Sequence, residues 1–305
     1  MKKPSLPESM FENVRPWSLV RIPHVLTLAA MCCATVEGHP LQAEVPASPP
    51  DSTVRIYGVR ILVSDIDEAV AFYSATLGFK VLSTVKYPSE VELKSEGLRL
   101  FLTRTGRPAQ YDYAGSVRTT FGFQANDLVE TRAKLEREGV VFLEPEPRTV
   151  GVGIASTFKD PSGNVLYLLE QQVGDRPPFE EPRIYNVGFH LPDEAVARQL
   201  YCDVLGFVVR TERYLPAIPL GHGDGTFAFM LHEKTDLKPR TSKYPDEAQI
   251  VPLFAATDLD AVVERLQRSG TQYATVASTN VRAITAYDAF GNVIEISEPG
   301  IHMSE

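Results

Sequence analysis

The chain has 305 residues, of which 44% are hydrophobic and 23% are charged, which is the composition of an ordinary globular protein with room for two domains. The formal net charge of -9 at pH 7 argues against a nucleic-acid-binding surface, because such a surface needs clustered Lys and Arg side chains. We therefore expect a small-molecule partner and no nucleic acid.

The N-terminal segment has the pattern of an export signal. Lys2, Lys3, Arg15 and Arg21 precede the uncharged run Ile22–Val36. Basic residues before a short apolar stretch are typical of a secretory signal peptide, and the stretch is too short to span a membrane comfortably. We expect a secreted or periplasmic protein whose leader is removed; the alternative is a disordered tail.

The rest of the chain is an internal duplication. Three separated motifs recur with one shift of 128 positions, from 55 to 183, from 72 to 200 and from 160 to 288. The motif pairs are Arg55–Val59 with Arg183–Val187, Phe72–Phe79 with Leu200–Phe207, and Asp160–Val165 with Asp288–Val293. A constant offset across three motifs indicates two copies of one unit.

Proline-rich segments mark the boundaries of the two units. Residues 1–38 form the predicted signal peptide, and 39–53 form a linker rich in proline. Domain one is expected over 54–173 and domain two over 182–299, with residues 174–181 as the connection.

Each unit is predicted to run strand, helix, three strands, and then to repeat that order. Alternating apolar residues predict strands, helical spacing predicts helices, and glycine after the last helical residue predicts where each helix ends. In unit one the predicted strands are 59–63, 80–87, 90–94, 98–103, 121–125 and 165–170, with helices 65–76 and 128–138 and a turn at 160–163. The second helix of unit two is predicted at 259–269.

At two places the sequence resembles the glyoxalase / bleomycin-resistance / extradiol-dioxygenase superfamily, also called vicinal oxygen chelate proteins. The run ILVSDIDEAVAFYSATLGF at 61–79 resembles the family's first strand and helix, and FKDPSGNVLYLLE at 158–170 resembles its last hairpin. The resemblance implies an α+β fold of tandem domains, each made of two βαβββ modules that form a curved mixed sheet with a concave cup.

The resemblance also implies a divalent metal held in the cup by His, Glu or Gln side chains from four strands. At three of those positions the residues are Gly58, Thr120 and Tyr167 in unit one, and Asn186, Val251 and Glu295 in unit two. Only Glu295 is of the family's ligand type, and combining positions from both units does not restore the set. We therefore expect no cofactor and no family metal site.

A non-standard metal site is the alternative. His190 and His232 share the cup-facing parity on strands that are neighbours in the family fold. With Glu295 they are the candidate ligands for Zn, Ni, Mn or Fe, although Glu295 lies at a different depth. Solvated histidines at the rim of the cup are the competing interpretation.

Strand parity suggests an anion-binding cup in unit one. It directs Arg60, Arg99 and Arg118 toward the concave side, together with Phe101 and Tyr167. Guanidinium groups bind carboxylates and phosphates, and aromatic rings stack on planar groups. The alternative is that these arginines sit at strand ends and pair with surface carboxylates.

Three functions follow from these patterns. The first is binding of a small, anionic molecule without a metal, as the resemblance to bleomycin-resistance proteins implies. The second is an enzyme, either a glyoxalase-type lyase or isomerase or a dioxygenase, with an unusual metal site or acid–base catalysis by Glu295 or Tyr167. The third is a structural role. Either a monomer or a homodimer fits the tandem arrangement, and no membrane span is expected.

Overall fold

A computed structural model describes residues 53–109, 119–172, 178–179, 182–210, 217–224, 226–233, 249–276 and 281–299. The predicted signal peptide and Arg118 lie outside these residues, so export remains a prediction. Within the described ranges, no helix has the length and apolar character needed to cross a membrane.

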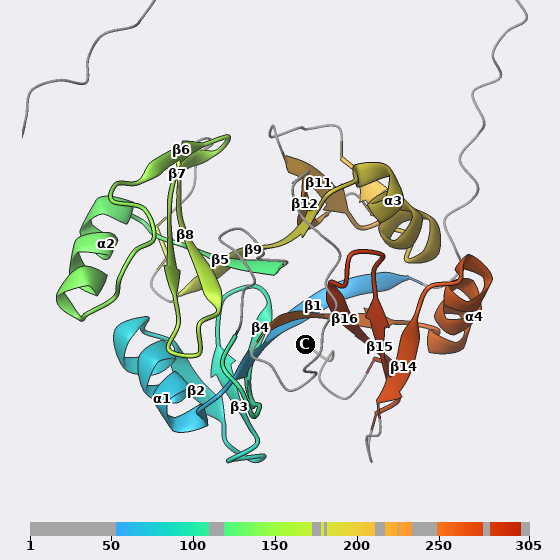
Figure 1. Cartoon of the computed structure of the whole chain (residues 1–305), viewed down its shortest axis with the longest axis horizontal. Helices are drawn as coiled ribbons and strands as arrows, with labels where there is room; N and C mark the ends of the chain where they lie inside the picture. The colour runs from blue at the N-terminus through green and yellow to red at the C-terminus, as the bar shows by residue number, and fades with distance from the viewer. Residues whose placement is uncertain are drawn as a thin grey trace, which may run out of the picture. The chain divides into compact units, whose positions relative to one another are not determined.

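Two mixed sheets of eight strands each form the body of the protein (Figure 1). Sheet A has the order β14-β15-β16-β13-β1-β4-β3-β2, and sheet B the order β10-β11-β12-β9-β5-β8-β7-β6. The strands of sheet A are β1 Val54–Val63, β2 Lys80–Ser83, β3 Glu90–Lys94, β4 Arg99–Arg104, β13 Ile250–Ala256, β14 Tyr273–Val276, β15 Ala283–Tyr287 and β16 Val293–Ser297. Those of sheet B are β5 Thr119–Gln124, β6 Arg148–Val150, β7 Gly153–Lys159, β8 Val165–Gln171, β9 Arg183–Leu191, β10 Val208–Val209, β11 Ala217–Gly221 and β12 Phe227–Glu233.

The α+β class and the tandem modules are confirmed, and the pairing of the modules adds something that the motifs did not reveal. Each sheet takes one module from each half of the chain. Strand β1 pairs antiparallel with β13, where Arg60 lies opposite Val251, and β5 pairs with β9, where Thr120 lies opposite Gly188. Both predicted domain ranges therefore contribute to both sheets.

Helices cover the outer faces of the sheets. They are α1 Ile66–Ala71, α2 Leu128–Arg137, α3 Glu194–Arg198 and α4 Leu259–Ser269, with the π-helical turns η1 Phe72–Thr76 and η2 Gln199–Val204 continuing α1 and α3. In each helix an aspartate caps the first turn by accepting backbone N–H bonds, namely Asp65, Asp127, Asp193 and Asp258. The core lies between helices and sheets, as the predicted parity requires, because Val59, Ile61 and Val63 are fully buried.

Hydrogen bonds from the repeated turn motif link the two modules of each half to each other. The Tyr73 hydroxyl donates to Asp160 Oδ2 at 3.0 Å, and Asn164 Nδ2 on sheet B donates to the Leu62 carbonyl of sheet A at 3.0 Å. Counterpart bonds join Tyr201 to Asp288 and Asn292 to the His190 carbonyl, each at 3.3 Å. These residues, which carry the family resemblance, thus hold the fold together.

Replacing Tyr73 by Phe should lower the free energy of unfolding by about 1–2 kcal/mol, because buried Asp160 loses one hydrogen-bond donor. The matched variant Tyr201→Phe removes a longer bond and should cost less. Urea denaturation of both variants measures the difference. Unchanged stability in Tyr73→Phe would show that this hydrogen bond does not stabilise the fold.

Candidate functional site

The helix-free face of each sheet is the candidate site, here called cup A for sheet A and cup B for sheet B. In cup A the half-buried side chains are mostly charged. Arg60 on β1 pairs with Glu295 on β16, and its Nε lies 3.5 Å from Glu90 Oε2 on β3. Arg99 on β4 donates from Nε to Glu92 Oε1 at 2.8 Å. Cup A is therefore spanned by ion pairs between its strands.

The directions of the pKa shifts of Glu90 and Arg60 are consistent with these ion pairs. Burial alone would raise the pKa of Glu90, but a hydrogen bond from Lys86 and the charge of Arg60 more than offset it and hold that pKa below its usual value. Burial would lower the pKa of Arg60, and the charges of Glu295 and Glu90 raise it instead. Both groups therefore remain ionised at neutral pH.

The structure places the described residues of the predicted anion site on two different sheets. Arg60, Arg99 and Phe101 lie in cup A, with the Arg99 guanidinium 5.0 Å from the Phe101 ring centre, but Tyr167 lies on sheet B. The grouping of Tyr167 with the arginines is corrected for this reason: β8 belongs to the sheet that contains β9, not β1. Glu90, Glu92 and Glu295 outnumber the two arginines, so this network has no spare positive charge for an anion.

Cup A does not suit the divalent metal that the fold family implies. The strand positions named from the resemblance hold Gly58, Val251 and Glu295 in this sheet, and the one carboxylate among them is bonded to the Arg60 guanidinium. A cation would have to displace that guanidinium. Over the described ranges, no group of three or more His, Cys, Asp or Glu residues is arranged to hold a metal ion.

Cup B has the same strand register with different chemistry. Arg60 pairs with Phe101 across β1 and β4, and its counterpart Gly188 pairs with Met230 across β9 and β12. Following the registers in this way matches five charged residues of cup A with five uncharged ones. Arg60, Glu90, Glu92, Arg99 and Glu295 correspond to Gly188, Ala217, Pro219, Ala228 and Tyr167. Four of the five replacements are also small.

In cup B polar side chains lie directly against the backbone of two glycines. A Cβ atom on Gly188 would lie 2.8 Å from Thr120 Oγ1 and 2.9 Å from the His232 ring, and one on Gly122 would lie 2.8 Å from Asn186 Oδ1. Such contacts are closer than carbon can tolerate, so only glycine lets these side chains lie flat across the strands. The glycines therefore shape the site.

Apolar and aromatic groups form the other wall of cup B. Val152, Ala155 and Leu169 form a cluster separate from the main core, with Tyr167 and Tyr185 packed against it. Burial raises the pKa of the Tyr167 hydroxyl, so it stays protonated at neutral pH. This wall can contact a planar, apolar ligand surface.

Arg148 is the basic group identified at cup B. Its guanidinium lies 5.0 Å from the Tyr167 ring centre, and its Nε donates to Glu144 Oε1 at 3.2 Å. Glu144 also accepts from the Thr157 hydroxyl at 2.7 Å. Sequence reasoning missed Arg148, because β6 is a strand of only three residues with no apolar alternation.

The two histidines lie together, as their parity predicted. The rings of His190 and His232 stack with centroids 5.1 Å apart and an interplanar angle of 22°. Burial, with a further contribution from Arg148, lowers the pKa of His232 to about 4, so it is neutral at pH 7. Glu295 lies on the other sheet, which corrects the grouping of His190, His232 and Glu295 as one ligand set. The two rings alone are an incomplete metal site.

Comparisons with known proteins agree with this architecture. Residues 55–168 match the family model described as Glyoxalase/Bleomycin resistance protein/Dioxygenase superfamily. An uncharacterized protein of Shewanella frigidimarina is 28% identical over 135 residues, which are 41% of this chain and 97% of that protein.

Two solved structures share the fold over most of the chain. Glyoxalase I from Zea mays has a TM-score of 0.58 at 18% identity, covering 81% of this chain and 93% of that one. A putative dioxygenase from Bacillus subtilis has a TM-score of 0.57 at 15% identity, with coverage of 83% and 88%. At these identities the likeness is one of fold.

Proposed function

Because residues 55–168 belong to the Glyoxalase/Bleomycin resistance protein/Dioxygenase superfamily and its fold is repeated along the chain, we propose that the protein binds a small planar organic molecule in cup B, without a metal ion. The observation that carries the proposal is the divergence of the two cups. Cup A is spanned by ion pairs, whereas cup B has uncharged residues at the same register positions, four of them small and the fifth Tyr167.

The chemistry of cup B favours an uncharged ligand over the anion that the arginines suggested. His232 is neutral at pH 7, and Arg148 already has Glu144 as a partner. The Tyr167 ring and the apolar cluster beside it offer a stacking surface, and Asn186, Thr120 and His232 offer hydrogen bonds. This is the usual composition of a small-molecule site, apolar with a few polar groups.

The enzymatic alternatives find less support in the same residues. A glyoxalase-type or dioxygenase reaction that depends on a metal needs a ligand set, and neither cup supplies one from its described side chains. Acid–base catalysis by Glu295 would have to compete with its ion pair to Arg60. Tyr167 has a raised pKa, which makes its hydroxyl a weak acid at neutral pH.

Titration with 2-naphthol and with its carboxylate analogue 2-naphthoate, followed by calorimetry, tests the proposal. We expect 2-naphthol to bind, and Tyr167→Ala to weaken its binding by about tenfold through loss of one stacking surface. Phe101→Ala is the matched aromatic truncation in cup A and should leave the affinity unchanged.

Two results would overturn the proposal, one on the place of the site and one on the charge of the ligand. The first is a loss of binding in Phe101→Ala with none in Tyr167→Ala, which would place the ligand in cup A. The second is preferential binding of 2-naphthoate, which would restore the anionic ligand. Absence of binding by either probe would remove the support for a planar ligand.

A further inference from the structure

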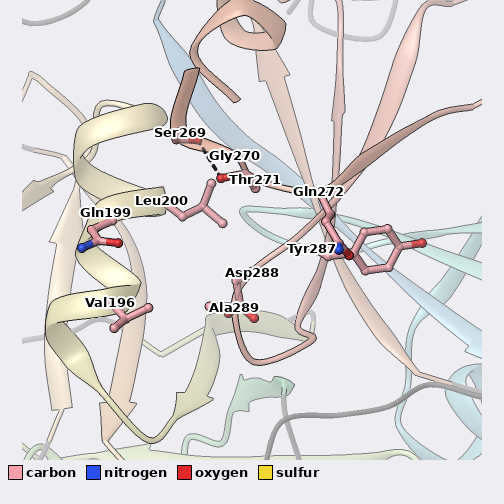
Figure 2. A pocket seen from close by; sticks show the side chains of 10 residues that line it. All are labelled: Val196, Gln199, Leu200, Ser269, Gly270, Thr271, Gln272, Tyr287, Asp288 and Ala289. Carbon is pink, nitrogen blue, oxygen red and sulfur yellow. Dashed lines mark hydrogen bonds between the residues drawn. The ribbon is translucent and has the colours of Figure 1, made fainter. Parts of the chain in front are cut away.

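A pocket of about 340 Å³ lies between the α3–η2 helical segment, the end of α4 and the end of β15 (Figure 2). One wall is the helical segment with Val196, Gln199 and Leu200. The opposite walls are residues 269–272, at and just after the C-terminal end of α4, and the turn 287–289 between β15 and β16. In Figure 2 Leu200 points from its helix into the space between these segments.

The duplication explains why there is space here. In the first half the corresponding region is packed by aromatic rings: Phe158 lies 6.4 Å from Phe72 and 5.3 Å from Phe142, centroid to centroid. The 128-residue shift places Leu200 at the position of Phe72 and Ala286 at that of Phe158. Two rings are thus replaced by smaller side chains in the second half, and Leu200 lines the pocket.

The described lining of the pocket has one acidic group and no basic one, and Arg268 lies beside it in the last turn of α4. Of the described residues that line it, Asp288 is the one that carries a formal charge, and none is Lys, Arg or His. Asp288 is buried, and its carboxylate accepts from Asn292 and from the Tyr201 hydroxyl. The C-terminal end of α4 adds the negative end of a helix dipole, roughly half an elementary charge, at Ser269 and Gly270.

The pocket lining contains both apolar and polar groups. Val196, Leu200 and Ala289 offer apolar contact, while the amides of Gln199 and Gln272 and the hydroxyls of Ser269 and Thr271 offer hydrogen bonds. The two hydroxyls already bond each other at 2.8 Å, in the position drawn in Figure 2. A ligand that fits has a compact apolar part and a polar head.

We propose that this pocket is a second binding site, for a small organic cation with a primary ammonium head and an apolar body. The negative helix end and Asp288 attract the ammonium group, Leu200 and Val196 contact the body, and no basic side chain of the lining repels it. The site is independent of the planar ligand of cup B, because it is built from α3, η2, α4 and the β15–β16 turn.

Three benzene derivatives of similar size and different charge are used as probes: benzylammonium, benzyl alcohol and benzoate. Binding is measured by ligand-observed NMR and calorimetry on the full chain. We expect benzylammonium to bind about tenfold more tightly than benzyl alcohol and benzoate not to bind, because the negative helix end favours a cation and disfavours an anion. Equal binding of benzylammonium and benzoate would overturn the charge assignment.

Two substitutions test whether benzylammonium binds in this pocket. Leu200→Phe restores the residue of the first half and should fill the pocket, weakening benzylammonium binding by about tenfold or more. Phe72→Leu makes the reciprocal change in the first half and should have no effect on that binding. If Leu200→Phe does not fold, the exposed Gln272→Lys variant puts a positive charge at the rim and should weaken binding similarly. Full affinity in the folded variants, or no binding of benzylammonium to the parent protein, would refute the proposal.

Discussion

Replacing Glu295 by Gln is expected to lower the free energy of unfolding by about 2–3 kcal/mol, measured by urea denaturation at pH 7. The loss follows from burial, because the Arg60 and Glu295 side chains are only 22% and 14% exposed. Without the carboxylate, the Arg60 guanidinium keeps only Glu90, at 3.5 Å, as a charged partner. A buried charge that loses its partner costs more than an exposed ion pair contributes.

Two controls separate burial from general disruption of the sheet. The double variant Arg60→Met, Glu295→Met removes both charges and keeps apolar volume, so it should recover most of the lost stability. Arg282→Ala, which removes an exposed partner of Asp260 and Glu298, should cost much less stability than Glu295→Gln. A Glu295→Gln variant as stable as the parent protein would mean that solvent screens the cup A network.

Much of the fold could be predicted from local sequence patterns. The alternation of Val59, Ile61 and Val63 fixed which side of β1 is buried, and the same parity correctly turned Arg60 to the other side. The Asp160–Asn164 turn was identified from its residue types, because Asp and Asn bond their own backbone in such turns. These features depend on contacts between residues close in sequence.

The partners of each site residue could not be predicted in the same way. Arg60 and Glu295 are 235 positions apart, and they meet because β1 pairs with β13 of the other half, which in turn pairs with β16. Strand parity predicts which face of the sheet a side chain lies on, but it does not predict which strand lies next to its own. The anion site was therefore assembled from one unit, although the structure combines β1 with β16 and β8 with β9 in different sheets.

Each cup is built from one module of each half, so the residues of the two cups lie in different modules and can be substituted independently. The strands of the first module lie in sheet A alone, and the strands of the second module lie in sheet B alone. Cup A could therefore acquire the Arg60–Glu295 pair while the register position of Glu295 in cup B holds Tyr167. Duplication without exchange of the sheets would have placed both modules of one half in one cup.

Lowering the pH from about 7 to about 4 is expected to remove about 2–3 kcal/mol of stability through His232 alone. The pKa of His232 is lowered from 6.5 to about 4 in the folded protein by burial, helped by Arg148, so the folded state binds fewer protons than the unfolded state between these values. Stability therefore rises with pH in that window. It is fully present above about 6.5 and is lost progressively as the pH falls toward about 4.

The variant His232→Gln isolates this contribution, because it keeps a polar side chain that does not titrate. The free energy of unfolding of both proteins is measured at several pH values, and the difference between the two curves is taken. Other buried groups, such as His222 and Asp160, titrate in both proteins and cancel in that difference. The difference should be flat above about pH 7 and change steadily below it. Parallel curves down to about pH 4 would show that His232 is solvated rather than buried, with a pKa near its ordinary value of 6.5.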